Sequence, residues 1–525
     1  MVGRAWWMGA AAGWGIVAGW WMPRGPLTIT QALWSVGLSV LVGALAGWSG
    51  RSRWSMLVAP AIFVVAVELL RLRVAGPSVD APHASAFGFV VLVAGRGVHG
   101  LLSVLPMALA AAYGAAYARR RHPLGRASDQ PVGQVGGQPV GQAGGRPVGQ
   151  VGGQAGGQPL GQAGGRAGGR RGWRYVRRAA TGLLTAFVLL VTVAVAVPAR
   201  TPAVAGEQGI AELTRIDAGG HRLGALIRGA DRTAPVLLFV PGAPGGSELG
   251  AARQHLAALE QRFVVVTLDR RGGGSSYPAL DPTATVTLDN AVADVVAVTE
   301  ALRRRFHQDK IYLLGHSGGS LLSVLAVQRR PQLYRAYIGA GQAVDLVESD
   351  EIFYADILAW ARATGRDGLA RTLTAQGPPP YRDVYAYEPI MLYENEVYDY
   401  DHTGNAEGAA DPFGGLGAAE LTLLQKVHTM NAVLDTWSAL YPRMQDVDLR
   451  RDVPQLEVPV YFVQGAHEMR GLAVVFQPWY EALRAPVKEL TVVPTGGHRA
   501  FLEQPQRFAD VMDRVLMQTG GAPGR

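Results

Sequence analysis

The chain has no cysteine among its 525 residues. This absence excludes disulfide bonds, catalysis by a thiolate and metal sites with cysteine ligands, but it does not assign the protein to a compartment. Charged side chains are also few, at 17% of the residues, and they are unevenly placed. Residues 119–178 contain eleven Arg and one Asp, a local charge of +10. The whole chain carries +8, so the residues outside this segment sum to −2 (8 − 10). The net positive charge of the chain therefore comes from residues 119–178.

This basic segment, 119–178, consists largely of an eight-residue repeat with almost no aromatic or branched apolar side chains. The repeat begins at Pro131, Pro139, Pro147 and Pro159. A segment of this composition cannot bury a core, so the sequence predicts a disordered Gly/Gln/Arg-rich linker. Its arginines lie between apolar stretches, which makes nucleic-acid binding a poor interpretation of the charge. We therefore expect no nucleic-acid partner.

Long apolar stretches occur only before residue 198. They are Ala5–Trp21, Ala32–Trp48, Met56–Leu70, Leu101–Ala118 and Ala179–Val197. Crossing the hydrocarbon of a bilayer takes about 20 residues, with ~17 as the lower limit. The third stretch is the shortest, and a further apolar piece, Ala86–Ala94, is typical of a re-entrant or interfacial segment. The sequence predicts a multi-span transmembrane region of about four helices over 1–118 and a further transmembrane helix over 179–198, with the lipid bilayer as a partner.

The arginines set the predicted orientation of these helices. Arg119–Arg121 and the five arginines between 170 and 178 flank the same connection, which is therefore expected in the cytoplasm. Five spans that start inside then place the C-terminal domain outside the cytoplasm, in a multi-pass protein of the cell membrane. Arg24, Arg71 and Arg73 would also lie outside, against the rule. The spans show no acidic pair or histidine ladder typical of transport, so their expected role is anchoring.

From residue 206 to residue 520, β-prone apolar runs alternate with helical patterns. The predicted strands are 213–216, 223–227, 236–240, 263–268, 310–314, 336–340, 458–463 and 489–493. Alternating βα units predict an α/β domain with a mainly parallel eight-stranded sheet, covered by helices on both faces. The stretch 343–453, between the sixth and seventh strands, is too long for one crossover. Its helical patterns, at 352–364, 367–375 and 418–440, predict a cap over a cleft.

The segment Gly315-His316-Ser317-Gly318-Gly319 joins the fifth predicted strand to a helical pattern. Gly-x-Ser-x-Gly at a strand-to-helix turn is the nucleophile elbow, which lifts the serine hydroxyl into a cleft. The motif alone is common by chance in a chain with 68 glycines, so its surroundings decide. The loop Pro241–Gly246 follows the third strand and would present the Ala243 amide to an oxyanion. The Gly318 amide would be the second donor.

A carboxylate and a histidine each follow a later predicted strand, namely Glu468 and His498. The order Ser317, Glu468, His498 is the order that serine hydrolases use on a sheet of this kind, and it predicts a catalytic triad. Asp345, after the sixth strand, is the alternative acid. His316 is expected to be an oriented neighbour of the elbow rather than a catalytic group.

With these motifs the C-terminal domain resembles the α/β-hydrolase superfamily, in particular the proline iminopeptidase-like serine peptidases. The loop Pro241–Gly246 is similar to that family's His-Gly-Gly-Pro-Gly-Gly loop. Asp269–Ser276 is similar to its Asp-x-Arg-Gly-x-Gly-x-Ser segment, and Gly315–Ser320 to its Gly-x-Ser-Trp-Gly-Ser elbow. Asp269 and Arg271 are expected to brace their loop beside the site and to take no part in the chemistry.

The resemblance also implies roles for the site residues. These are Ser317 as nucleophile, His498 as base, Glu468 as orienting acid, and the amides of Ala243 and Gly318 as oxyanion donors. Three departures from the family pattern stand out: Pro241 replaces His, Gly318 replaces Trp, and Glu468 stands where Asp is usual. The first two changes alter the pocket wall, so prolyl specificity is not carried over.

The family's cap carries acidic residues that receive the free α-amine of a peptide. The acidic residues available here are Glu388, Glu394, Glu396, Asp399 and Asp401. A solvated acidic loop is the favoured interpretation of this cluster.

The expected function is that of a membrane-anchored serine hydrolase of the aminopeptidase type, acting on a small peptide without cofactor or metal. A carboxylic-ester hydrolase is the first alternative, because it shares every motif above and differs only in the cap. A non-catalytic sensing or binding module on a hydrolase fold is the alternative of another class. The oligomeric state and the identity of the substrate stay open.

Overall fold

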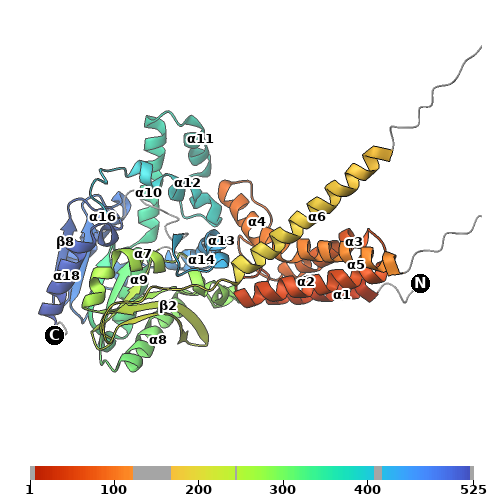
Figure 1. The fold of residues 1–525 in the computed structure, drawn as a ribbon. Coiled ribbons are helices and arrows are strands. Elements are labelled where there is room, and N and C mark those ends of the chain that lie inside the picture. The colour runs from red at the N-terminus through yellow and green to blue at the C-terminus, as the bar shows by residue number, and fades with distance from the viewer. Residues whose placement is uncertain (1–5, 122–166, 243–244, 407–416, 521–525) are drawn as a thin grey trace, which may run out of the picture.

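The computed structural model describes residues 6–121, 167–242, 245–406 and 417–520. It consists of an α/β domain and, to one side of it, a group of long N-terminal helices (Figure 1). Most of the predicted linker, and Ala243 of the predicted oxyanion loop, lie outside the described residues.

One eight-stranded sheet lies at the centre of the α/β domain, in the order β1-β2-β4-β3-β5-β6-β7-β8. Its strands are β1 Ile210–Ala218, β2 His221–Gly229, β3 Val236–Val240, β4 Val264–Leu268, β5 Ile311–His316, β6 Tyr334–Ala340, β7 Val460–Gly465 and β8 Lys488–Val493. β2 runs antiparallel to both β1 and β4, and all other pairs are parallel. Every predicted strand overlaps an observed one, and the predicted α/β-hydrolase fold class is confirmed. The carboxyl ends of the parallel strands meet at one edge, where the loops of the predicted site converge.

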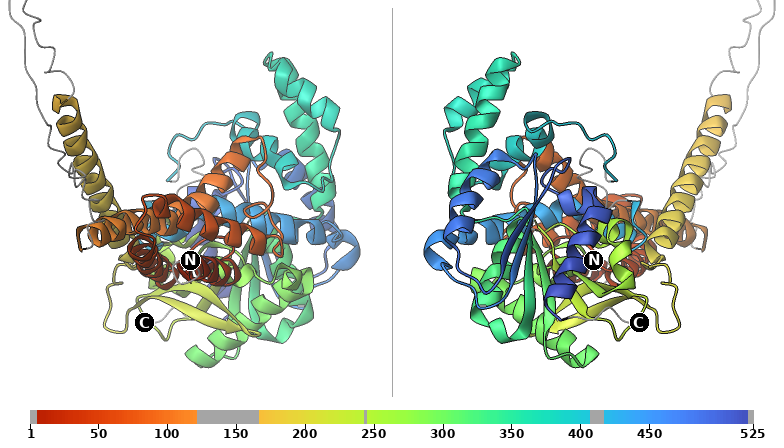
Figure 2. Two further views of the ribbon diagram at one scale, coloured as in Figure 1. Left: turned by 90° about the vertical axis from the view of Figure 1, so that its right-hand side faces the viewer. Right: turned by 90° about the vertical axis from the view of Figure 1, so that its left-hand side faces the viewer.

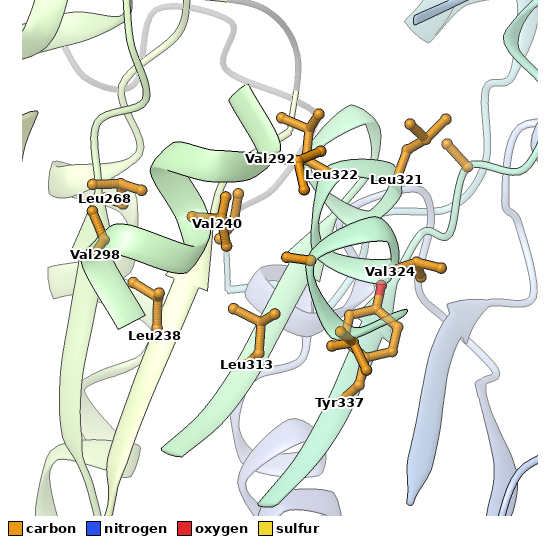
Figure 3. Close-up of a cluster of buried hydrophobic side chains, with 14 of the residues drawn as sticks. Leu238, Val240, Leu268, Val292, Val298, Leu313, Leu321, Leu322, Val324 and Tyr337 are labelled. Carbon is orange, nitrogen blue, oxygen red and sulfur yellow. The ribbon is translucent and has the colours of Figure 1, made fainter. Parts of the chain in front are cut away.

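Helices cover both faces of this sheet. They are α7 Leu249–His255, α8 Leu288–Phe306, α9 Gly318–Arg329, α15 Leu449–Asp452, α16 Arg470–Ala482, α17 Ala500–Glu503 and α18 Pro505–Gln518. On one face, α8 and α9 bury branched side chains against the central strands (Figure 3). On the other face, α7, α17 and α18 pack over a second apolar cluster. Because both faces are buried, β3, β4 and β5 are apolar or small along almost their whole length.

The predicted cap is helical, but two details of its prediction were wrong. It contains α10 Leu346–Ala363, α11 Asp367–Gln376, η7 Val384–Tyr387, α12 Glu388–Val397, α13 Leu423–Val427 and α14 Thr429–Met444. The apolar pattern from 418 to 440 predicted one helix, whereas the chain breaks at His428 between α13 and α14. The first part of the acidic segment is not a loop but helix α12, which begins with Pro at an early position where proline fits.

The N-terminal part consists of helices that lie in front of the α/β domain in the left view of Figure 2. They are α1 Trp6–Trp21, α2 Ile29–Gly50, α3 Ser55–Arg71, α4 Ala86–His99, η2 Gly100–Val104, α5 Leu105–Arg121 and α6 Ala167–Ala196. Among the described residues, three helices are long and apolar enough to cross a membrane: 29–50, 86–121 and 175–196. The apolar piece 86–94 was expected to be a separate re-entrant or interfacial segment. It instead forms the first turns of a continuous 36-residue helix, 86–121, which comprises α4, η2 and α5.

The helices α2 and α5 approach each other closely at glycine positions. A Cβ at Gly43 would lie 2.1 Å from the carbonyl oxygen of Met107, and one at Gly47 would lie 2.0 Å from that of Ala111. Any larger residue at these positions would push the backbones apart. Such small-residue spacing is how apolar helices pack within a membrane, where burial of apolar surface does not drive association.

Candidate active site

Ser317 lies in the sharp turn between β5 and α9, with φ 50° and ψ −129°. A non-glycine residue in this region is strained, and such strain persists where the surrounding structure enforces it. The neighbouring backbone is close-packed: a Cβ at Gly319 would lie 2.1 Å from the carbonyl oxygen of Pro241, and one at Gly242 would lie 2.7 Å from the Ser317 Cβ. The turn and the loop after β3 therefore require small residues at these positions.

The Gly318 amide is the first of helix α9 and has no carbonyl partner within the helix. It therefore points out of the helix N-terminus, where the helix dipole favours negative charge. The second predicted donor, Ala243, lies outside the described residues. Its preceding neighbour Gly242 is held in place, because its carbonyl oxygen accepts a hydrogen bond of 2.9 Å from the Arg270 guanidinium.

The absence of a side chain at Gly318 leaves space beside the elbow. A Cβ at that position would meet the Cε atom of Met444, on the cap helix α14, at 3.6 Å, which is ordinary van der Waals contact. The space beside Gly318 is therefore bordered by the flexible side chain of Met444.

The imidazole of His498 and the carboxylate of Glu468 form a hydrogen bond of 2.7 Å, from Nδ1 to Oε1. The two side chains are 16% and 2% exposed, and the Met469 amide donates a second bond to the same carboxylate oxygen at 2.9 Å. Burial alone would lower the pKa of His498, but the charge and hydrogen bond of Glu468, with a contribution from Glu394, raise that pKa above its ordinary value.

His498 is placed beside the elbow by several contacts. Its ring lies over Gly341, where a Cβ would be 2.9 Å from the ring atoms Nδ1 and Cε1. The preceding residue, Ala340, accepts a hydrogen bond of 3.1 Å from the Ser317 amide. Among the hydrogen bonds of the described residues, none joins the Ser317 hydroxyl to His498. In structures without substrate, such catalytic hydrogen bonds are often long.

Three residues near the site, His316, Asp269 and Arg271, were expected to have structural roles, and each is held by polar contacts. The Nε2 atom of His316 lies 3.2 Å from the His498 carbonyl oxygen, and burial lowers the pKa of this imidazole so that it stays neutral. Asp269 accepts bonds of 2.8 and 2.6 Å from the amide and hydroxyl of Ser275, while burial raises its pKa to about 6. Arg271 forms a two-bond ion pair with Asp294.

The alternative acid, Asp345, has other partners. It caps helix α10 by accepting a 3.0 Å bond from the Glu348 amide, and it pairs with Arg450 at 3.1 Å. The hydrogen bond to the His498 imidazole is made by Glu468.

Sequence reasoning missed two residues that hold the His498 loop. The buried Glu503 carboxylate accepts bonds from the Gly497 amide at 2.7 Å and the Tyr400 hydroxyl at 2.5 Å. Arg499 forms an ion pair with Glu248 at 2.8 Å and so connects the histidine loop to the segment after β3. The Tyr400–Glu503 and Glu248–Arg499 pairs have no sequence signal, because their members lie 103 and 251 positions apart in the chain, respectively.

Among the described cap residues, Glu394 on α12 interacts electrostatically with the histidine–carboxylate pair. Burial raises the pKa of its carboxyl, the positive charge of His498 lowers it, and the negative charge of Glu468 raises it. Two of the other predicted acids are engaged elsewhere: Glu388 accepts a bond from the Ala86 amide, and Glu396 pairs with Arg366. The cap therefore places a carboxylate close enough to His498 for their charges to interact.

An eight-stranded sheet of this order, with a strained serine elbow at the end of β5 and a histidine–carboxylate pair on the loops after β8 and β7, defines the α/β-hydrolase class of proteins. The Alpha/beta hydrolase family matches residues 237–511, and the chain belongs to this family. It is a hydrolase with peptidase-named relatives.

Among these relatives is the "Probable aminopeptidase YbaC" of Bacillus subtilis (strain 168), with 27% identity over 309 residues, or 59% of this chain and 97% of that protein. The "Probable proline iminopeptidase" of Leptolyngbya boryana is 23% identical over 54% of this chain and 87% of its own length. Among solved structures, the proline iminopeptidase of Mycobacterium smegmatis matches with 19% identity and a TM-score of 0.43, covering 59% of this chain and 98% of that chain.

Proposed function

We propose that the protein is a membrane-anchored serine hydrolase of the aminopeptidase type, with Ser317, His498 and Glu468 as its catalytic triad. The observation that carries the proposal is the 2.7 Å bond between the His498 Nδ1 atom and Glu468. With Nδ1 held in this way, the Nε2 atom of the ring is left to act on the serine. The strained backbone of Ser317 supports its assignment as the nucleophile.

In the proposed reaction, Ser317 Oγ attacks the carbonyl carbon of the substrate while His498 Nε2 takes the hydroxyl proton. Glu468 stabilises the resulting imidazolium. The oxyanion is held by the Gly318 amide and an amide of the loop after β3, for which Ala243 is our candidate, each worth about 3 kcal/mol at the transition state. His498 then gives its proton to the departing amine, and water releases the acyl group from Ser317 by the same steps.

The aminopeptidase type is supported by Glu394. A cap carboxylate whose charge interacts with that of His498 would accept the α-ammonium group of a peptide whose first carbonyl lies at Ser317. An ester substrate without an amine would gain nothing from this charge. The wild-type enzyme is therefore expected to hydrolyse aminoacyl-arylamides with a free amine faster than their N-blocked counterparts and faster than short acyl esters.

Substitution of Glu394→Gln tests this role. We expect the KM for free-amine arylamides to rise about 10- to 100-fold, because a charged hydrogen bond is worth about 1.5–3 kcal/mol, while the KM for N-blocked esters stays unchanged. Steady-state kinetics on both substrate classes measure the difference. Glu396→Gln, on the same helix and paired with Arg366, is the matched control. Equal effects on both substrate classes, or a wild-type preference for blocked esters, would replace the peptidase with a carboxylic-ester hydrolase.

Membrane anchoring is supported by the three long apolar helices. The loops 22–28 and 72–85, at one end of this helix group, contact the α/β domain, which fits a topology with both loops and the domain on one side. We propose that this side is extracytoplasmic. A reporter fused after Pro198 is expected to be active only when that reporter works outside the cytoplasm.

A further inference from the structure

A buried arginine from the N-terminal helices enters the hydrolase domain. Arg24 lies in the loop between α1 and α2 and is 1% exposed. Its guanidinium donates to five acceptors. They are the two carboxylate oxygens of Asp281 at 3.1 Å each, Asp435 at 2.6 Å, the Ser78 hydroxyl at 3.0 Å and the Ala75 carbonyl at 2.8 Å. All five N–H donors of an arginine are thus used in one place.

Asp435, on the cap helix α14, is the centre of this network and is fully buried. Besides Arg24, it accepts bonds from the Tyr277 hydroxyl at 2.5 Å, the Ser78 amide at 2.8 Å and the Ser78 hydroxyl. Two loops of the N-terminal helices, the segment before Asp281 and helix α14 therefore converge on one carboxylate. A buried charge with so many partners fixes its neighbours, because separating any one leaves polar groups unpaired.

The first half of α14, together with its N-cap residue His428, continues this contact. The His428 imidazole lies 3.2 Å from the Pro26 carbonyl oxygen, and the side-chain amide of Asn431 donates to the Val91 carbonyl at 3.1 Å. Leu434 packs with Phe87 and Val91 of α4 in one apolar cluster. The N-terminal helices therefore contact α14 itself, and Figure 1 shows α4 beside it.

The same helix touches the candidate site. A Cβ at Gly245, in the loop after β3, would lie 2.1 Å from the Ala432 carbonyl oxygen, one turn of helix from Asp435. The Thr436 hydroxyl donates to the Gly272 carbonyl at 2.9 Å, in the loop whose Arg270 holds Gly242. At the other end of α14, Met444 lies against Gly318. This contact is about 14 Å along the helix from Asp435, at 1.5 Å per residue.

We propose that Arg24 is a positioning residue for the active site, so that the N-terminal helices are a working part of the hydrolase as well as its anchor. Arg24 holds Asp435, Asp435 fixes α14, and α14 sets the position of the loop that carries the oxyanion donor. This inference rests on the proposed function. It also explains why Arg24 departs from the positive-inside rule: the residue is held within the protein by its ion pairs.

The test uses the full chain in detergent micelles. A fluorophosphonate probe measures the labelling rate of Ser317, and arylamide turnover per labelled site gives kcat; thermal unfolding gives Tm. Arg24→Gln and Asp435→Asn are each expected to slow labelling and turnover about 100-fold, the loss that a 1 Å misplacement near the chemistry produces. The double variant is expected to be no slower than the slower single variant, because both act through one contact.

Arg73→Gln removes a charge from an exposed position near the same helix ends and is expected to label like the wild type. Unchanged labelling and turnover in Arg24→Gln and Asp435→Asn, with only Tm lowered, would overturn the inference, and so would independent losses that add in the double variant. Failure of the wild type to label would instead overturn the proposed function.

A milder substitution covers the case in which Arg24→Gln does not fold. Asp281 is 34% exposed, so Asp281→Asn loosens the guanidinium without leaving a deeply buried charge unpaired. A folded Asp281→Asn protein with labelling slowed several-fold supports the positioning role, and one that labels at the wild-type rate contradicts it.

Discussion

Replacing Ser317 with alanine is expected to lower kcat by about 10⁴- to 10⁶-fold, the range in which loss of a triad nucleophile falls. The neighbouring hydroxyl of Ser320 is already engaged, because it donates to the Ser317 carbonyl at 2.5 Å and accepts from the Ala343 amide at 3.0 Å, so attack on the substrate carbonyl would be left to water. Labelling by a fluorophosphonate should disappear as well, because the serine oxygen forms the bond to phosphorus that displaces fluoride from the probe, while the hydroxyl proton passes to His498. Gel-based labelling and steady-state turnover of the full chain measure both effects.

Ser323→Ala is the matched control for this substitution. Ser323 lies on helix α9, which follows Ser317, and its hydroxyl donates to the Gly319 carbonyl at 2.8 Å. Loss of this hydroxyl is expected to cost about 1 kcal/mol of stability and to leave labelling intact. Labelling that survives in Ser317→Ala would move the nucleophile to another residue. Absence of labelling in the wild type would favour the non-catalytic sensing module.

The sheet was predictable from local sequence because it is buried on both faces. The run Val236–Val240 is continuously apolar, and Val264–Leu268 is apolar apart from Thr267, so their limits are visible without any knowledge of their partners. The site prediction used the same regularity. Each predicted catalytic residue lies within a few positions of the end of a strand, and the carboxyl ends of parallel strands must meet, so the sequence could pair Glu468 with His498, whose side chains lie 2.7 Å apart.

What could not be predicted depends on contacts between distant segments. Glu394 is one of five acidic residues in a short stretch, and only its electrostatic interaction with His498 and Glu468 in the folded chain distinguishes it. Arg24 and Asp435 are 411 positions apart, and from sequence Arg24 was merely an exception to the charge rule. Glu503 shows the same limit, since its partners are an amide and a hydroxyl, which carry no pattern.

Replacing Glu468 with glutamine is expected to lower kcat by about 10⁴-fold, as happens when the acid of a triad becomes an amide and favours the wrong imidazole tautomer. The same substitution should also change the pH dependence of the activity. In the wild type the carboxylate raises the pKa of His498, so activity rises with pH through a value above the ordinary one near 6.5. Without the carboxylate, burial and the charge of Arg499 lower that pKa, and the acid limb of kcat/KM should move to lower pH.

Stability gives an independent readout of the same pair, with the sign fixed by linkage. Because the pKa of folded His498 lies above its unfolded value, the pair stabilises the fold fully below about pH 6.5 and loses that contribution as pH rises through the folded pKa. Glu468→Gln should therefore lower Tm more at pH 5.5 than at pH 8.5, two conditions on either side of ~6.5. Glu457→Gln, at an exposed position before β7, should change neither profile. An acid limb that stays in place would remove Glu468 from the triad and return the orienting role to Asp345, whose replacement by asparagine would then have to reproduce the loss.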